Sequence, residues 1–242
     1  MHPTITIITV CLNSQDTIGK TIDSVISQKY DALEYVIVDG GSTDNTLKII
    51  EGYRDSLAGV LKLVSEPDNG IYDAMNKGIV MATGDLICML NSDDRLTDGA
   101  LNTVADAYDG DKYTVIYGMQ RRIKDGRVYS CGFYGHEFLD CVNIPHQAAY
   151  VSRAAYERFG TYDTRYKCNS DHDLMIRLYN SGEVTFHPVE KVLADFFEGG
   201  MSSGYIGHIE DAKIRKKYGF IGNGQYIYLV FRAWFLRLIG RI

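Results

Sequence analysis

The first hundred residues alternate between two hydrophobic periods, and this alternation limits the possible folds more than any other feature of the chain. Residues 4–10 (TITIITV) have the β-branched pattern of a buried strand, whereas residues 17–28 place Ile18, Ile22 and Val25 on one helical face. Strands joined by helices pair in parallel through right-handed crossovers. The pattern therefore predicts an α/β fold with a mostly parallel, Rossmann-like central sheet flanked by helices. Further strands are expected at 35–38, 61–64 and 86–90, and further helices at 44–53 and 71–81.

After residue 110 the alternation becomes irregular, as is typical of a substrate-binding half. We expect one continuous domain over residues 1–220, with halves 1–110 and 111–220, followed by an amphipathic helical extension over 221–242. Helices are expected at 98–108, 152–159 and 171–181, short strands at 114–118, 184–187 and 192–196, and a hairpin at 123–129.

Composition narrows the class of protein. The net charge of −6 argues against a nucleic-acid-binding protein. The five cysteines show no CxxC spacing, no signal peptide precedes the first strand, and no run of 18 apolar residues occurs. These features predict a cytoplasmic protein. The charge is uneven, however, because residues 201–242 hold seven Lys or Arg against two Asp or Glu.

Polar clusters follow four of the expected parallel strands, at 9–13, 39–44, 65–70 and 91–94. Ligands of open parallel sheets bind at the carboxyl ends of the strands, so these clusters are expected to meet at one edge. Taken singly, DGGSTD (39–44) also fits a tight turn with a helix cap, and NSDD (91–94) fits a capping loop. The phosphate-binding motifs GxGxxG and GxxxxGK[ST] are absent. The remaining carboxylate and amide oxygens suit Mg²⁺ or Mn²⁺, which commonly accompany a diphosphate.

Together these segments resemble the family 2 glycosyltransferases, which are inverting enzymes of the GT-A fold, and in particular those that build bacterial surface polysaccharides. The resemblance spans residues 4–220. It implies a nucleotide-sugar donor bound by residues 1–110, an acceptor bound by residues 111–220, and a divalent cation. The matching segments are TVCLN (9–13), VDGGSTDNT (38–46), SEPDNGIYDAMNKGI (65–79), GDLICMLNSDD (84–94), SDHDLMIRL (170–178) and FFEGGMSS (196–203).

The resemblance also implies roles for individual side chains at the donor site. Asp39 would accept a hydrogen bond from the base, most often uracil in this family. Asp93 stands at the final carboxylate of the family's DxD motif and would coordinate Mn²⁺ or Mg²⁺ on the diphosphate. Asn91 replaces the usual first carboxylate, so this site carries one negative charge fewer, and Asp94 is a second candidate ligand. The nucleotide-binding set implied in this way is Thr9, Asn13, Asp39, Asp68 and Asn91.

Asp171 matches the position of the family's general base, near the start of an expected helix. Inversion needs one direct displacement at the anomeric carbon, and a carboxylate opposite the leaving group would take the proton of the acceptor hydroxyl. The residues alone leave an alternative open, in which Asp171 or Asp173 only caps the helix and complements its dipole.

Several other residues are weaker candidates for contact with the acceptor or a phosphate. His146 would contact either group, or is an ordinary loop histidine. The glycine-rich loop with Gly199, Gly200 and Ser202 would fold over the donor diphosphate and bring His208 near the metal. Tyr72 would stack on the base or the sugar.

The last 17 residues (YIYLVFRAWFLRLIGRI, 226–242) are dense in aromatic and aliphatic side chains, and three arginines interrupt them. This composition fits an amphipathic helix in a membrane interface, where anionic lipids attract basic residues. It fits equally a helix that docks on its own domain or on a partner subunit. A lipid-linked acceptor would give the interfacial helix a purpose, on the cytoplasmic face of the inner membrane.

The sequence thus predicts metal-assisted transfer of a sugar, with inversion, from a nucleotide-sugar donor that we expect to be UDP-linked, to a saccharide or lipid-linked saccharide. The pathway that we expect is cell-surface polysaccharide or lipopolysaccharide biosynthesis. A sugar nucleotidyltransferase is one alternative, but TVCLNSQD (9–16) lacks the basic, glycine-rich phosphate loop that such an enzyme needs. A catalytically weak nucleotide-sugar-binding protein or a scaffold protein, derived from that fold, is another, because Asn91 departs from the family motif.

Overall fold

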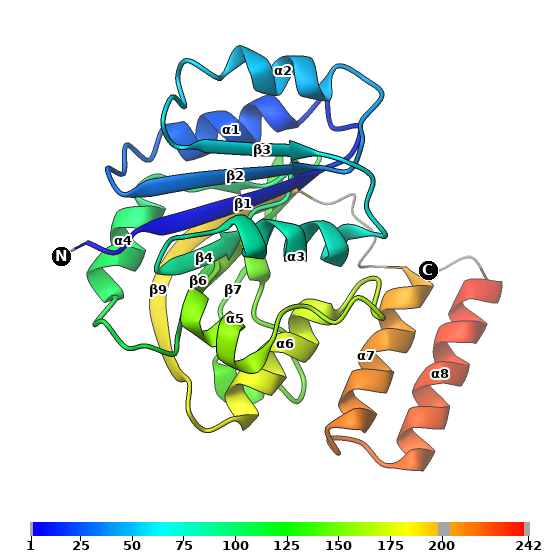
Figure 1. Ribbon diagram of the computed structural model, residues 1–242. Helices are drawn as coiled ribbons and strands as arrows, with labels where there is room; N and C mark the ends of the chain where they lie inside the picture. Colours follow the sequence, from blue (N-terminus) through cyan, green and yellow to red (C-terminus); the bar gives the residue numbers. More distant parts are fainter. Residues whose placement is uncertain (1, 198–203, 240–242) are drawn as a thin grey trace.

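A computed structural model describes residues 2–197 and 204–239 (Figure 1). Its centre is a sheet with strand order β3-β2-β1-β4-β8-β6-β9-β5, in which β7 pairs with the outer part of β6. The strands are β1 (Ile5–Cys11), β2 (Leu33–Asp39), β3 (Leu61–Ser65), β4 (Leu86–Met89), β5 (Arg95–Leu96), β6 (Thr114–Lys124), β7 (Arg127–Gly132), β8 (Ala149–Ser152) and β9 (Thr185–Phe197).

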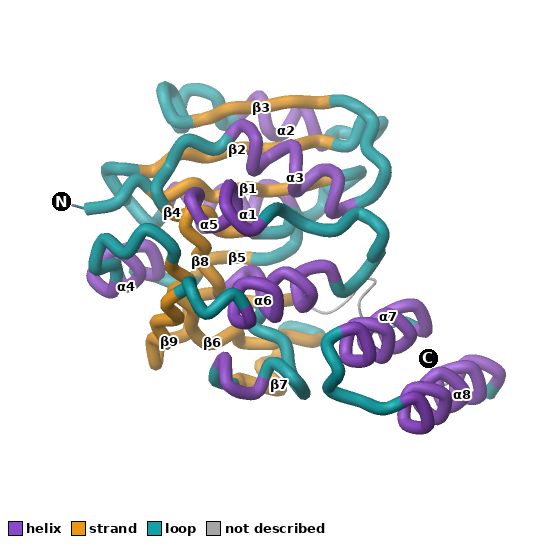
Figure 2. The backbone as a smooth tube through the Cα atoms, turned by 60° about the horizontal axis from the view of Figure 1, so that its bottom comes forward, coloured by secondary structure: helices purple, strands orange, loops and turns teal. Residues whose placement is uncertain are grey.

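The first four strands pair in parallel, as the sequence predicts. β1 is buried along its whole length because helices cover both of its faces, and its β-branched residues suit such a position. The apolar sides of α1, α2 and α4 pack on one face, and those of α3, α5, α6 and α7 on the other (Figure 2). The helices are α1 (Ile18–Ile26), α2 (Thr46–Gly52), α3 (Ile71–Met81), α4 (Ala100–Ala107), α5 (Arg153–Phe159), α6 (Ser170–Asn180), α7 (Tyr205–Lys217) and α8 (Asn223–Leu238).

The second half differs from the sequence-based expectation in the length of its strands. The segments expected at 114–118 and in the first arm of the hairpin are one strand, β6, and those expected at 184–187 and 192–196 are one strand, β9. Pro188, Glu190 and Lys191 interrupt the hydrophobic pattern, but β9 continues through them as a bulge against β6. A Cβ atom on Gly118 would lie 2.7 Å from the Lys191 carbonyl oxygen, so glycine permits this close pairing.

α7 and α8 form an antiparallel pair at one end of the molecule (Figure 1). Residues 226, 229, 230, 233 and 236 of α8 are buried or half-buried, at the spacing of one helical face. The opposite face exposes its large apolar side chains, which are Ile227, Tyr228, Phe231, Trp234, Phe235 and Leu238. α8 is therefore apolar on two sides, only one of which the described chain covers.

A buried carboxylate joins the parallel strands at the end opposite the polar clusters. Glu34 of β2 accepts hydrogen bonds from the Thr6 hydroxyl of β1 (2.6 Å) and from the amide and hydroxyl of Thr83 before β4 (2.7 and 2.6 Å). Lys62 of β3 approaches it at 2.5 Å. Burial alone would raise the pKa of Glu34, but these contacts outweigh it and lower the pKa to about 2.

We expect Glu34→Gln to lower the free energy of unfolding at pH 7 by up to about 3 kcal/mol, from the pKa difference of the group between the folded and unfolded states. Because the folded pKa is depressed, this contribution is complete above the unfolded pKa and is lost as the pH falls towards the folded value. Urea unfolding at several pH values tests this. Glu51→Gln, at an exposed pair with Arg54, is the matched control, and an equal loss of stability at pH 7 in both variants would contradict the expectation.

Candidate active site

The polar clusters meet at a cavity of about 960 Å³ at the carboxyl ends of β1 and β4. The β1–α1 loop, the start of α3 and the segment after β4 form one side of it. The long second half contributes Gln120 and Arg122 of β6, residues 142–147 and residues 167–171. The cavity therefore lies between the two halves of the chain, at the sheet edge where the sequence analysis expects a ligand.

Asp171 lies on this cavity in the first turn of α6 and is only 7% exposed. Its Oδ1 atom accepts a hydrogen bond from the Tyr72 hydroxyl of α3 at 3.1 Å. Its Oδ2 atom accepts from the Asn143 amide at 2.8 Å and lies 3.1 Å from Nδ1 of His146. Burial would raise the pKa of Asp171, but the contacts with His146 and Asn143 hold it below its usual range. Asp171 is thus an ionised hydrogen-bond acceptor at neutral pH.

His146 connects this carboxylate to the segment after β4. Its Nε2 atom lies 3.2 Å from the side-chain nitrogen of Asn91, which donates to it. The Nδ1 atom then carries the imidazole proton and donates to Asp171, so a neutral imidazole satisfies both contacts. His146 stands between Asn91 and Asp171 rather than free in a loop.

Asp93 and Asn91 line the same cavity. Burial raises the pKa of Asp93, and within residues 2–197 and 204–239 no Lys or Arg offsets its charge. The Oδ1 atom of Asn91 is buried and has no hydrogen-bond partner among the described residues. A carboxylate and an amide oxygen that both lack partners are a donor set that fits Mg²⁺ or Mn²⁺.

Asp94 lies apart from this donor set. It is fully buried, outside the cavity wall, and accepts hydrogen bonds from the Gln147 side chain (2.9 Å) and the Phe197 amide (3.3 Å). Burial, with the nearby charge of Asp93, raises its pKa to about 7. The structure thus does not bring Asp94 to the metal position suggested for it, because its carboxylate turns inward to β9.

Only some residues of the predicted nucleotide-binding set line the cavity. Asn13 and Asp68 line the cavity. Asn13 also accepts a hydrogen bond from the Thr43 amide at 2.9 Å and so holds the 39–44 turn. Asp68 accepts from the Gly70 amide at 2.8 Å. It leans over Gly40, where a Cβ atom would lie only 2.4 Å from its Oδ2 atom.

Thr9 and Asp39 do not line the cavity. Thr9 shares a face of β1 with Ile5 and Ile7 and is buried, with its hydroxyl 3.1 Å from that of Tyr35. Asp39 is fully buried at the end of β2. The structure thus does not bring either side chain to the cavity wall, and their contact with a nucleotide stays a prediction.

Asp39 instead organises its own loop. Its carboxylate accepts hydrogen bonds from the hydroxyls of Ser42 and Ser65 and from the amides of Gly41 and Ser42, at 2.5–3.1 Å. Burial would raise its pKa, but these donors lower it. The carboxylate stabilises the turn that Asp68 covers.

His208 is exposed on the first turn of α7 and does not line the cavity, so the structure does not bring it to Asp93. Gly199, Gly200 and Ser202 lie outside the described residues.

Sequence reasoning missed two residues that build the site, Asn143 and Glu210, and gave a different role to a third, Tyr72. Asn143 comes from a loop without hydrophobic period, and Tyr72 was expected to stack on a ligand rather than to hold Asp171. Glu210 of α7 is buried and accepts hydrogen bonds from the backbone amides of residues 167–169, at 2.8–3.2 Å. It thereby fixes the segment that leads into α6. No short-range signal marks these residues, because their partners are 28 to 99 positions away.

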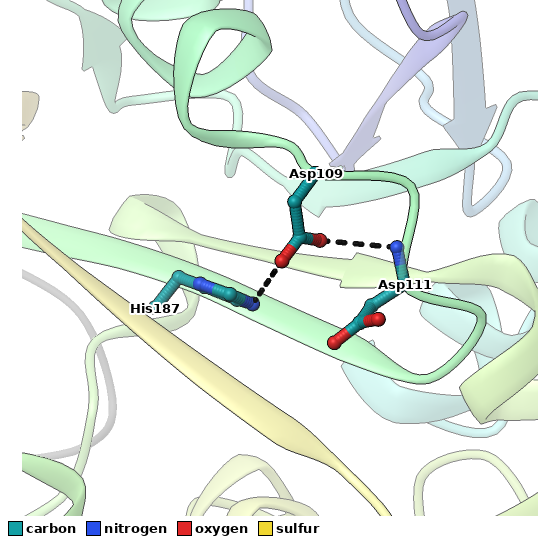
Figure 3. A group of neighbouring side chains, drawn as sticks. All are labelled: Asp109, Asp111 and His187. Atoms are coloured by element: carbon teal, nitrogen blue, oxygen red, sulfur yellow. Dashed lines mark hydrogen bonds and ion pairs between the residues drawn. The ribbon is translucent and has the colours of Figure 1, made fainter.

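A second group of possible metal ligands lies at the opposite end of the sheet, where Asp109, Asp111 and His187 come together (Figure 3). Nε2 of His187 is 3.6 Å from a carboxylate oxygen of Asp109. Both aspartates are exposed, and exposed acidic groups commonly lie together without a metal ion. We assign no metal to this group.

The arrangement of the sheet, its helices and the cavity is that of the GT-A fold. The sequence model of the family "Glycosyl transferase family 2" matches residues 6–131. The chain is 31% identical over 204 residues to a PGL/p-HBAD biosynthesis glycosyltransferase of Mycobacterium bovis, covering 83% of this chain and 80% of that protein. An uncharacterized glycosyltransferase of Mycobacterium tuberculosis is 33% identical over 183 residues, 72% of this chain and 68% of its own. The chain belongs to glycosyl transferase family 2 and is a glycosyltransferase.

Solved structures confirm the GT-A fold that the sequence predicts. Residues 1–349 of TarS from S. aureus, in complex with UDP-GlcNAc, superpose with a TM-score of 0.68 at 17% identity, covering 96% of this chain and 71% of that one. The mannosyltransferase PcManGT from Pyrobaculum calidifontis, in complex with GDP-Man and Mn²⁺, gives a TM-score of 0.66 at 20% identity, covering 98% and 70%.

We expect Asp171→Asn to abolish sugar transfer while nucleotide binding is retained, because an amide cannot accept the proton of the acceptor. Loss of a general base typically costs roughly 10²–10⁴-fold in rate. Transfer assays and calorimetric nucleotide titration on the same preparation measure the two effects. Asp109→Asn, an exposed carboxylate outside the cavity, is the control, and unchanged transfer in Asp171→Asn would refute this role.

Proposed function

We propose that this glycosyltransferase moves a sugar from a nucleotide-sugar donor to a hydroxyl acceptor with inversion, assisted by a divalent cation. One observation carries the proposal, namely that an ionised carboxylate (Asp171) and an oxygen donor set (Asn91 and Asp93) line one cavity and are joined through His146. A base and an anion-binding position on the same cavity are what a single displacement requires.

In the proposed reaction Asp171 takes the proton of the acceptor hydroxyl as the hydroxyl oxygen attacks the anomeric carbon. The bond from that carbon to the nucleoside diphosphate breaks on the opposite face, and the diphosphate leaves with the electron pair. His146 and Asn143 hold Oδ2 of the carboxylate. The Tyr72 hydroxyl keeps its proton, which is shared between the Cys168 carbonyl oxygen and Oδ1, because burial and the charge of Asp171 raise its pKa well above the usual value.

The charges of the cavity explain why a cation is needed. Its wall carries four carboxylates, on Asp16, Asp68, Asp93 and Asp171, against two cations, on Arg122 and Lys167. A diphosphate is repelled by such a surface unless a cation accompanies it. We propose that Asp93 and the orphaned oxygen of Asn91 hold Mn²⁺ or Mg²⁺, which would offset the charge that develops on the departing diphosphate.

The expected donor is UDP-linked, and residues 1–110 bind it in our proposal while residues 111–220 bind the acceptor. The bound UDP-GlcNAc and GDP-Man of the two structural neighbours support a nucleoside-diphosphate sugar in general. The name of the mycobacterial relative, and that of a Pasteurella multocida chondroitin synthase that is 27% identical over 187 residues, support a saccharide or glycolipid acceptor. We propose a role in cell-surface polysaccharide or lipopolysaccharide biosynthesis.

Titration of UDP, GDP and dTDP, each with and without Mn²⁺, tests the donor and the metal together. We expect one nucleotide to bind tightly only with Mn²⁺, and Asp93→Ala to remove the Mn²⁺-dependent part of the affinity. Asp111→Ala, at an exposed carboxylate, is the control. Unaltered Mn²⁺-dependent binding in Asp93→Ala would place the metal elsewhere, and no binding of any nucleotide would favour the scaffold alternative.

We further propose that α8 attaches the enzyme to the cytoplasmic face of a membrane. None of the described helices is long and apolar enough to cross a membrane. The uncovered face of α8 has Ile227, Phe231, Trp234 and Leu238 in one stripe, and residues 212–242 contain seven Lys or Arg and no Asp or Glu. Anionic lipid headgroups complement this charge, and the acyl region accommodates the aromatic side chains.

Trp234 is the only tryptophan of the chain and reports directly on this face. We expect its fluorescence to shift to the blue with phosphatidylglycerol vesicles and little with phosphatidylcholine vesicles. Phe231→Glu should weaken vesicle binding at least about tenfold, since burial of one aromatic side chain is worth roughly 1.5–3 kcal/mol. Val128→Glu, an exposed site on β7, should bind as the unaltered enzyme does. Equal binding of both vesicle types, or of both variants, would contradict the proposal.

A further inference from the structure

A second cavity, of about 570 Å³, opens beside the first one. It lies between the start of α3, residues 164–168, the start of α7 and Arg237 of α8. The two cavities share part of their walls, namely Gly70, Ile71, Tyr72, Lys167 and Cys168. A ligand of this cavity would therefore lie next to the reaction centre. Its volume falls within the usual range of small-molecule sites.

Tyr72, in the wall between the two cavities, contacts Asp171, the proposed base. The Tyr72 hydroxyl contacts Oδ1 of Asp171 at 3.1 Å and the Cys168 carbonyl oxygen at 2.7 Å. Glu210 fixes the amides of residues 167–169 from the other side. A molecule that occupies the second cavity and extends past Tyr72 would thus bring its end to Asp171.

The lining of the second cavity combines apolar side chains with positive charge. Ile71, Tyr166, Tyr205 and Ile206 supply apolar surface, and Ile206 remains 46% exposed. Lys167 and Arg237 are the cations, and neither forms an ion pair within the described ranges. The Arg237 guanidinium lies 4.8 Å from the centre of the Tyr205 ring.

Among the described residues of the lining, the one carboxylate is already engaged. Asp73 accepts a hydrogen bond from the Asn69 amide at 2.9 Å and lies 3.9 Å from Lys77. Two unneutralised cations beside an apolar wall match a ligand that has a phosphate and a hydrocarbon part.

We propose that this cavity binds a phosphate-bearing lipid-linked acceptor, with its phosphate at Lys167 and Arg237 and its first hydrocarbon units on Tyr205 and Ile206. The inference rests on the proposed function and names the acceptor class of that site. Arg237 belongs to α8, so the cavity borders the helix whose uncovered face is proposed to lie in the membrane interface. A lipid at that interface would enter the cavity past Tyr205 and Ile206, and its sugar would reach Asp171.

The test uses the full-length enzyme and farnesyl phosphate below its critical micelle concentration, titrated by calorimetry. We expect farnesyl phosphate to bind at least tenfold more tightly than either inorganic phosphate or farnesol. Ile206→Glu should weaken that binding tenfold or more, because it puts a negative charge on the hydrocarbon wall. Glutamate is well tolerated in the first turn of a helix, so the fold of α7 should persist. Val80→Glu, at an 84% exposed position of α3 outside both cavities, is the matched control.

Nucleotide titration of the same preparations distinguishes failure of the second-cavity inference from failure of the proposed function. If a nucleotide binds and Ile206→Glu leaves farnesyl phosphate binding unchanged, the second cavity is not the acceptor site although the proposed function stands. Equal affinity for farnesyl phosphate and inorganic phosphate would reduce the site to anion binding and overturn the inference. Equal affinity for farnesyl phosphate and farnesol would remove the role of Lys167 and Arg237 and overturn it also. If no nucleotide binds, the proposed function itself fails.

Discussion

The rest of the site depends on one buried carboxylate that must stay ionised. Removing a charge from water is costly, and a buried Asp would ordinarily take up a proton. Asp171 avoids this because donors from separate elements converge on it, with Tyr72 from α3 and both Asn143 and His146 from the loop before β8. These donors are far apart in sequence, so the carboxylate can act as a base only when the two halves of the chain are correctly packed. Residues 1–110 therefore contribute, through Tyr72, to the surroundings of the proposed base.

The position of Asp171 depends also on the C-terminal helices. α7 holds the residues before Asp171 through Glu210, and it reaches the residues after it through Lys217 and Tyr218, which contact the Asp173 carboxylate at 2.6 and 3.1 Å. α7 thus contacts the chain on both sides of Asp171, just before α6 and within its first turn. α8 packs on α7 and offers its other apolar face outward. If α8 binds a membrane as proposed, α7 and Asp171 would take a fixed orientation relative to the membrane surface.

The hydrophobic period of a segment predicts its secondary structure correctly where the residues of that segment alone set its buried face. The amphipathic period predicts α3 at the residues where the structure has it, Ile71–Met81. β6 and β9 were divided in the prediction because their outer parts are held by pairing with each other, which the pattern of a single strand does not contain. The site follows the same rule: motif position led to Asp171 and Asp93, whereas Asn143 and Glu210 act through distant partners. Thr9 is different, since its alternation with Ile5 and Ile7 already indicates that it faces the interior.

Asn91 illustrates how one amide can match both of its neighbours. A carboxylate at this position would need a proton on Nε2 of His146, and the imidazole would then be charged, since Nδ1 must also donate to Asp171. The amide of Asn91 instead donates to Nε2, so that one tautomer of a neutral imidazole satisfies both contacts. The same substitution leaves the cavity wall one negative charge poorer beside Asp93, which lessens repulsion of a diphosphate. The departure from the family motif is therefore compatible with the proposed function, because Asn91 holds His146 while its Oδ1 atom has no other partner among the described residues.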